Sequence, residues 1–447
     1  MLTLKLAFRG LWRHRMRTMF TLIAVAFGHL FLLVTVSLSE GGLMEMVEIA
    51  IRQGTAGHVV VQAEGYQKTA AVELVVEDGA AVRKRIRTRL PQGRILLRVF
   101  GGGLASTASD SIGIRFTGVE PRREGQVSVL AKHLIRGVYL DASAADVKRA
   151  RARLAQEAVT RKAQGKPAPS GHLDCLRPPR PGEPDIHPVV IGARLAETLR
   201  VDLCGGLRLQ AQGLGAQEQQ KFHVVGIFQT GNETLDGYYV HLRLSDAQRL
   251  LRLGHAVHQV AVILDSQERT RSVAAAVRDV LRDDSSLAVL TWDKAMPEMA
   301  EFIAMKKSSG WVFIFIVMLI MAIGVLNTVL MSVMERVREF GVMRALGAGP
   351  GRILGLVLTE GALLGLLGVT LGLLISWPLI HYLETTGIVY PKPMSAVGVT
   401  VTSIKARLEL STLVYFSLGL FLTTVAATLM PALRAARVKV LSAVHQA

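Results

Sequence analysis

The sequence predicts a membrane α-helical protein with four transmembrane helices and a large α+β domain inserted between helices 1 and 2. Half of the 447 residues are hydrophobic, and the mean hydropathy is +0.36. This value is high for a water-soluble chain and low for one that lies wholly in a membrane. The apolar residues also gather in four windows that are long enough to cross a bilayer core, which takes about 20 residues of helix.

The four windows divide the chain into segments. They cover residues 19–38, 311–334, 353–380 and 412–433. The first window is too long for the apolar core of a signal peptide and has no cleavage site of small residues, so we expect a retained anchor. Between the windows lie the large domain at 39–310, a short charged segment at 335–352 and a short loop at 381–411.

The basic residues of the short flanks predict the orientation. Residues 1–18, 335–352 and the tail at 434–447 are rich in Lys and Arg, which favours the cytoplasmic side for all three and for both termini. Residues 1–18 also alternate apolar and basic side chains as an amphipathic interfacial helix does, with Leu4, Phe8 and Leu11 on one face. Topology thus explains much of the formal net charge of +17, and we expect no nucleic-acid partner.

The segment 39–310 mixes strand and helix patterns. Runs such as GHVVVQAEGY and FHVVGIFQTG are typical of strands, whereas RTRSVAAAVRDVLRD repeats apolar residues at helical spacing. A helical and Pro-rich insertion at about 143–188 interrupts this pattern. Two interpretations of the insertion stay open, namely a surface decoration and a contact with a partner or with lipid.

The sequence contains no pattern that indicates catalysis. It lacks a phosphate-binding G-x-x-x-x-G-K-[ST] loop, an H-E-x-x-H pair, a C-x-x-C pair and a G-x-S-x-G turn, so we expect no catalytic residue, no cofactor and no metal site. Whether the two cysteines, Cys175 and Cys204, form a disulfide stays open. Two ionisable residues, His29 and Glu360, fall inside the apolar windows. They would bond neighbouring helices or line a proton or substrate path.

The short segment 335–352 predicts an amphipathic helix between two spans. An apolar line runs through Val337, Phe340, Met343 and Leu346, and the Gly-Ala-Gly-Pro-Gly run after it ends the helix. Such a helix is suited to lie in a groove of a partner protein. The alternative is a turn that lies against the bilayer.

The run NTVLMSVMERVREFGVMRALGAGPGRILGLVLTEGALLGLLG resembles the signature of FtsX-like ABC transporter permeases, the MacB-like, mechanotransmission class (type VII). The stretches GHVVVQAEGY and VVIGARLAETLRVDLCGGLRL resemble the periplasmic core of this family, most closely its lipoprotein-releasing LolC/LolE branch. The resemblance implies a multi-pass protein of the bacterial inner membrane with its large domain in the periplasm. It also implies that the short helix couples to an ATPase through Glu335, Arg336, Arg338, Glu339, Phe340 and Arg344.

The resemblance further implies the partners. Permeases of this class work as dimers, with a second copy or a paralogue, and bind two copies of a separate ATP-binding subunit. The chain would then be a non-catalytic subunit that extracts a lipid-anchored or amphipathic substrate such as a lipoprotein. Two alternatives stay open: efflux of peptides or macrolides with a periplasmic adaptor protein, and the switching of a periplasmic hydrolase. One departure is the C-terminal PALRAARVKVLSAVHQA, which lacks the family's Asp-Pro.

Overall fold

The computed structural model describes residues 7, 15–54, 56–163, 187–396 and 398–438. The chain forms two compact units. Unit 1 comprises Met1–Glu45, Ile303–Pro391 and Thr402–Ala447, and unit 2 comprises Met46–Phe302 and Lys392–Val401. The predicted interfacial helix at 1–18, the Pro-rich part of the insertion, Cys175 and the end of the tail lie largely or wholly outside the described residues. Cys204 is disulfide-bonded.

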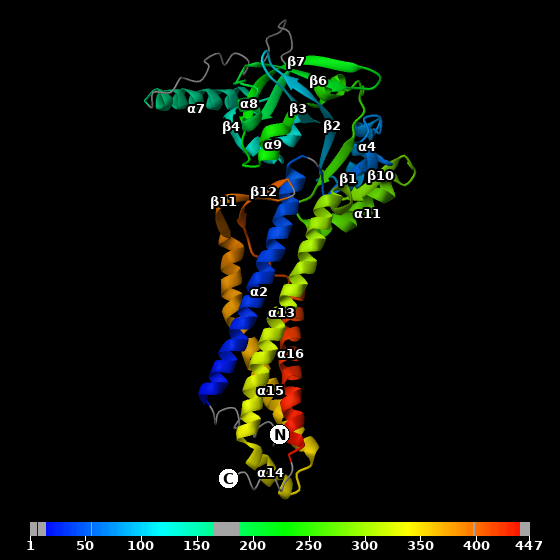
Figure 1. The fold of residues 1–447 in the computed structure, drawn as a ribbon. Helices are drawn as coiled ribbons and strands as arrows, with labels where there is room; N and C mark the ends of the chain where they lie inside the picture. The colour runs from blue at the N-terminus through cyan, green and yellow to red at the C-terminus, as the bar shows by residue number, and fades with distance from the viewer. Residues whose placement is uncertain (1–6, 8–14, 55, 164–186, 397, 439–447) are drawn as a thin grey trace. The chain divides into compact units, whose positions relative to one another are not determined.

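Unit 1 is built on four long helices, drawn in blue, yellow, orange and red in Figure 1. Each is long and apolar enough to cross a membrane. They are α2 (Arg15–Arg52), α13 (Pro297–Glu335), α15 (Pro350–Thr386) and α16 (Leu410–Ala436). Each of the four includes one predicted window. At 1.5 Å per residue, the 38 residues of α2 and the 39 of α13 extend well beyond a hydrocarbon core of about 30 Å.

Glycines on α15 permit close helix packing inside unit 1. A Cβ atom at Gly361 would lie 2.2 Å from Thr428 of α16, and one at Gly372 would lie 2.8 Å from the carbonyl oxygen of Ala26 in α2. Small residues at such contacts let helix backbones approach in a membrane, where van der Waals packing replaces the hydrophobic effect.

Residues 381–411, predicted as a short loop, contain a two-stranded sheet of β11 (Ile388–Ala396) and β12 (Val399–Ile404). The chain after it stays close to the first helix, because the backbone amide of Arg407 donates to the carbonyl of Ser37 at 2.9 Å. The end of this segment is therefore fixed to α2 within unit 1, whereas Lys392–Val401 of the two strands belong to unit 2.

Unit 2 contains a mixed ten-stranded sheet. Its order is β10-β1-β9-β2-β3-β8-β5-β7-β4, and β6 pairs with both β2 and β7. The β3–β8 and β5–β7 pairs are parallel, and the other pairs are antiparallel. The strands are β1 (Val59–Ala63), β2 (Arg94–Ser106), β3 (Ser111–Val119), β4 (Leu134–Gly137), β5 (Pro188–Gly192), β6 (Gly206–Gln212), β7 (Gln217–Phe228), β8 (Tyr239–Arg243), β9 (Gln259–Ile263) and β10 (Leu287–Thr291).

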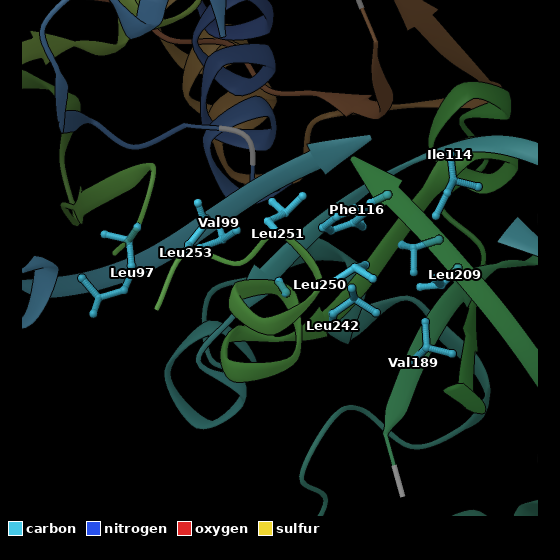
Figure 2. Close-up of a cluster of buried hydrophobic side chains, with 14 of the residues drawn as sticks. Leu97, Val99, Ile114, Phe116, Val189, Leu209, Leu242, Leu250, Leu251 and Leu253 are labelled. Carbon is cyan, nitrogen blue, oxygen red and sulfur yellow. The ribbon is translucent and has the colours of Figure 1, made fainter. Parts of the chain in front are cut away.

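Short helices cover this sheet. The helices are α3 (Tyr66–Thr69), α4 (Gly79–Arg89), α5 (Pro121–Glu124), α6 (Val129–Lys132), α7 (Ala144–Ala163), α8 (Ala193–Thr198), α9 (Glu233–Tyr238), α10 (Leu244–Leu250), the 3₁₀ turn η2 (Gln267–Arg269), α11 (Thr270–Leu281) and α12 (Trp292–Ala295). Figure 2 shows the core between α10 and the strands, where Leu250 lies near Phe116 and Leu242. The predicted helix RTRSVAAAVRDVLRD is α11, and it buries Val273 and Val277 as its spacing indicates.

Two strands that follow one another along the chain lie apart in the sheet. FHVVGIFQTG contributes to β7 and YYVHL to β8, but β5 is hydrogen-bonded between them. The first half of the insertion forms the predicted helix, α7, which packs its Val147 and Ala150 into a cluster with β4 and β7.

A polar cluster lies in the interior of unit 2. The Arg98 guanidinium donates to both carboxylate oxygens of Glu124, at 3.0 and 2.7 Å, and both side chains are fully buried. Arg98 also donates to the carbonyl oxygen of Ala56, just after α2. Nearby, the Tyr139 hydroxyl lies 2.8 Å from Nδ1 of His241. Burial lowers the pKa of His241 to about 4 and raises the pKa of Tyr139 well above its usual value.

Candidate functional site

The candidate site is the short helix α14 (Val337–Ala345), which joins α13 to α15. The break before it falls at Arg336, whose backbone has left the helical region (φ −105°, ψ 12°). The break after it uses Gly347 at φ 89°, a left-handed conformation that favours glycine, and then Pro350 at the first turn of α15. The short helix therefore ends at the glycine and proline that the sequence predicts as its termination signals.

A buried ion pair fixes this break. Nη1 of Arg336 lies 2.7 and 3.0 Å from the two carboxylate oxygens of Glu360 in α15. Nε of Arg336 donates to Glu339 at 3.2 Å, and the guanidinium lies 5.2 Å from the ring centroid of Phe340. Both charged side chains are only 10% exposed. Glu360, the ionisable residue of the third window, thus pairs with an arginine of the same unit.

The inner face of α14 packs into its own helical unit. Phe340 is fully buried in a cluster with Val333 of α13 and with Ile353 and Val357 of α15. The apolar line that we expected to meet a partner therefore points inward at Phe340. Val337 and Met343 are half-buried, and Leu346 at the end of the line is 84% exposed.

Two further polar contacts tie the site to the other helices. Arg17 of α2 forms an ion pair with Glu335 at 2.7 Å. The guanidinium of Arg344 donates to the carbonyl oxygens of Ala436 and Val438, at 3.0 and 3.2 Å, at the end of α16. All four long helices of unit 1 therefore contact the segment around α14.

The outer face of the segment is exposed. Arg338, Val342 and Ala345 follow a spacing of four and three residues, which places them on one side of the helix. Val342 is 48% exposed. Among the six residues expected to couple to an ATPase, Arg338 and Glu335 are exposed, Glu339 and Arg344 are half-buried, and Arg336 and Phe340 are buried. Val342 and Ala345, which the sequence prediction did not include, share this exposed side with Arg338.

His29, the other ionisable residue inside a window, lies elsewhere in unit 1. It is fully buried, and its Nε2 lies 3.0 Å from the Ser417 hydroxyl of α16. Its bond joins α2 to α16, whereas Glu360 pairs with Arg336. The two residues therefore have different partners.

No group of three or more His, Cys, Asp or Glu side chains in the described ranges is placed to hold a metal ion. His258, part of an H-x-x-H pair in the sequence, is used in packing. Its Nδ1 accepts from the amide of Phe100 at 3.0 Å, and its Nε2 lies 3.1 Å from the carbonyl of Val72. Both ring nitrogens are thus engaged by backbone groups.

Two family models match the chain. The MacB-like periplasmic core domain matches residues 18–280, and the FtsX-like permease C-terminal domain matches residues 311–440. The second match contains α14 together with Arg336 and Glu360.

Curated relatives include transport proteins. The chain is 23% identical over 282 residues to the lipoprotein-releasing system transmembrane protein LolC of Xylella fastidiosa, covering 60% of this chain and 66% of that protein. It is 31% identical over 149 residues to the pyoverdine export ATP-binding/permease protein PvdT of Pseudomonas aeruginosa, covering 32% of this chain and 20% of that protein. The chain thus spans less than two thirds of the length of these relatives.

A solved structure with similarity is the periplasmic region of MacB from Actinobacillus actinomycetemcomitans. The match covers 56% of this chain and 95% of that one, with a TM-score of 0.33 and 11% identity. The family assignment rests on the two domain models, one of which covers more than half of the chain. The chain belongs to the FtsX-like permeases that carry a MacB-like periplasmic core domain.

Proposed function

We propose that the chain is the permease subunit of an ATP-driven ABC transporter, and that α14 is the helix on which a separate ATP-binding subunit acts. One observation carries the proposal. α14 is held to the helical unit by the buried Arg336–Glu360 pair, while Arg338 and Val342 stay exposed on its outer face. A partner that binds the exposed face of α14 therefore moves α14 together with the long helices of unit 1.

The contacts of α14 within unit 1 connect it to each of the four long helices, and a displacement of α14 is transmitted through them. Arg336 and Phe340 connect α14 to α15 and α13, Glu335 connects to α2 through Arg17, and Arg344 connects to α16. α2 and α13 each continue without a break into residues of unit 2. A displacement of α14 therefore has two continuous helices along which it can reach the mixed-sheet unit.

The proposed setting is the bacterial inner membrane. Both termini and α14 lie in the cytoplasm, and the mixed sheet, which follows the first span in the chain, lies in the periplasm. The permease acts as a dimer, with a second copy or a paralogue, and binds two ATP-binding subunits. ATP hydrolysis belongs to that partner.

For the substrate we propose a lipid-anchored or amphipathic molecule that the periplasmic unit extracts from the membrane. The similarity to LolC, whose name describes lipoprotein release, supports this class. Export with an adaptor protein is the second candidate, supported by the similarity to PvdT, whose name describes pyoverdine export.

The first experiment is a pull-down of the detergent-solubilised chain from its own cells, followed by mass spectrometry of proteins and lipids. An ATP-binding subunit together with a lipoprotein or lipid supports extraction. The same subunit with a periplasmic adaptor favours export, and one with a peptidoglycan hydrolase favours a switch. Recovery without any ATP-binding subunit contradicts the mechanism.

The second experiment tests the outer face of α14. The double variant Arg338→Glu and Val342→Asp should lower recovery of the ATP-binding subunit at least tenfold, because both side chains are exposed and charge reversal opposes docking. Glu339 is left unchanged, since it bonds Arg336. Arg271→Glu, an exposed position in α11 of the other unit, is the matched control. Normal recovery with the double variant would refute this role of α14.

A further inference from the structure

A groove beside the edge strand β4 belongs to no part of the coupling site. Its volume is about 830 Å³, within the range of about 300–1,000 Å³ that small-molecule sites occupy. The walls come from α5 and α6 on one side and from the first half of α7 on the other. β4 and the chain that follows it form the floor.

One face of α7 forms a wall of the groove. Asp146, Arg149, Ala150, Arg153 and Leu154 line it, at the spacing of a single helical face. Ala150 and Leu154 are buried at its base, whereas the Arg149 side chain is 72% exposed. The wall is therefore apolar below and cationic at the rim.

The floor adds apolar surface that stays exposed among the described residues. Ile135 of β4 lines the groove and is 51% exposed. Leu134 and Leu140 line it as well. Because β4 ends the sheet order, this surface lies at an edge, where a ligand can approach.

The charges of the groove are unbalanced. Five cationic side chains line it, against the two carboxylates of Asp141 and Asp146. Both carboxylates are already neutralised, Asp141 by Arg243 at 2.6 Å and Asp146 by Arg149 at 2.5 Å. The lining cations are Arg122, Lys132, Arg136, Arg149 and Arg153.

Three of these cations are available to a ligand. Arg136 pairs with Asp202 and Arg149 with Asp146. Arg122, Lys132 and Arg153 are exposed, and within the described residues no carboxylate forms an ion pair with them. The groove thus offers positive charge at its rim and hydrocarbon at its base.

We propose that this groove binds an anionic amphiphile, a molecule with a phosphate or carboxylate head and a hydrocarbon chain. The head meets Arg122, Lys132 and Arg153, since cations bind such oxygens through charge-assisted hydrogen bonds. The chain lies along Ile135 and Leu134, where burial of apolar surface stabilises it. This site is independent of the ATP-binding partner, so either proposal can fail alone.

The test uses the full-length chain in phosphatidylcholine nanodiscs, with the fluorescent acid dansylundecanoic acid as the probe and empty nanodiscs as background. We expect saturable binding that dodecyl phosphate displaces. Inorganic phosphate, which lacks the chain, and dodecanol, which lacks the charge, should each displace the probe far less. Equal displacement by either of these two would overturn the amphiphile assignment, as would binding no greater than that of empty nanodiscs.

Matched variants on α7 locate the site. Arg153→Glu should weaken probe binding roughly tenfold or more, because it places a negative charge beside the anionic head. Lys148→Glu makes the same charge change at an exposed position of the same helix that does not line the groove, and it should leave binding unchanged. Both positions are exposed, so neither variant perturbs the core. Equal losses in the two variants would indicate diffuse attraction and refute the site.

Discussion

The sharpest prediction concerns the ion pair that fixes α14. The perturbations are Arg336→Met, Glu360→Leu and the two together. Each single change leaves one charge in a site where both side chains are about 10% exposed. The double change removes both charges and fills the space with side chains of similar length.

The magnitude follows from the geometry. The guanidinium meets both carboxylate oxygens, at 2.7 and 3.0 Å. Two unit charges about 4 Å apart interact by about 4 kcal/mol at an effective dielectric constant of about 20. Removal of one partner of a buried pair costs about 3–5 kcal/mol, whereas replacement of both is often close to neutral. Arg336→Met should cost about 1 kcal/mol more than Glu360→Leu, because it also loses the bond to Glu339 and the stacking on Phe340.

The assay is equilibrium unfolding of the full-length chain in mixed micelles, titrated with sodium dodecyl sulfate. A double-mutant cycle then isolates the coupling between the two positions. Arg338→Met is the control, because this arginine is exposed and lies on the same helix; it should change the free energy of unfolding by less than about 0.5 kcal/mol. Single variants that cost below about 1 kcal/mol, or a double variant that costs the sum of the two, would refute the reasoning.

Three further predictions concern packing and buried charge. Gly372→Ala should destabilise unit 1 by about 1–3 kcal/mol, because the new Cβ would meet a backbone oxygen at 2.8 Å. Gly355→Ala is the control and should leave the stability unchanged, because a Cβ there has nothing within 4 Å. Equal thermal unfolding midpoints for the two variants would contradict this prediction. Arg98→Met should destabilise unit 2 by about 3–5 kcal/mol, because it leaves Glu124 buried and unpaired; an unfolding midpoint like that of the native chain would be the contrary result. The pKa of His241 is about 4 in the folded chain and about 6.5 in the unfolded chain. The neutral imidazole therefore contributes fully to the free energy of unfolding above pH 6.5, and about 3 kcal/mol of that free energy is lost as the pH falls toward 4. His241→Phe should flatten this decline in a pH series of unfolding midpoints, and an unchanged decline would exclude His241 as its source.

Periodicity and hydropathy predicted the elements better than their arrangement. The apolar windows lie on long helices because a bilayer imposes length and composition locally. The extension of α2 beyond its window depends on tertiary contact: Gly41 lies so close to the Lys405 carbonyl that a Cβ there would meet the oxygen. The position of β5 between β7 and β8 likewise reflects pairing between distant segments, which local patterns do not encode.

The site was predictable in type but not in orientation. The charges and the Gly-Pro signals predicted a short helix between two spans, and α14 is that helix. The apolar line through Phe340 and Leu346 did not reveal that the first residue is buried and the second is 84% exposed. A buried glutamate inside a span predicts a partner. The sequence did not identify this partner as Arg336, which lies 24 positions away, because the pairing depends on how α13 and α15 pack together.

The ion pair is better explained by orientation than by stability. A buried pair contributes little net free energy compared with apolar residues of the same size, so stability alone does not account for Arg336 and Glu360. The break at Arg336 interrupts the helix between α13 and α14, and apolar contacts alone would let α14 rotate about that point. The guanidinium is held at two nitrogens, because Nη1 contacts both oxygens of Glu360 and Nε donates to Glu339, and a planar group fixed at two atoms accepts few orientations. The pair therefore fixes the direction of α14 where the backbone does not, which is the property that a helix needs if a force applied to it is to move the spans.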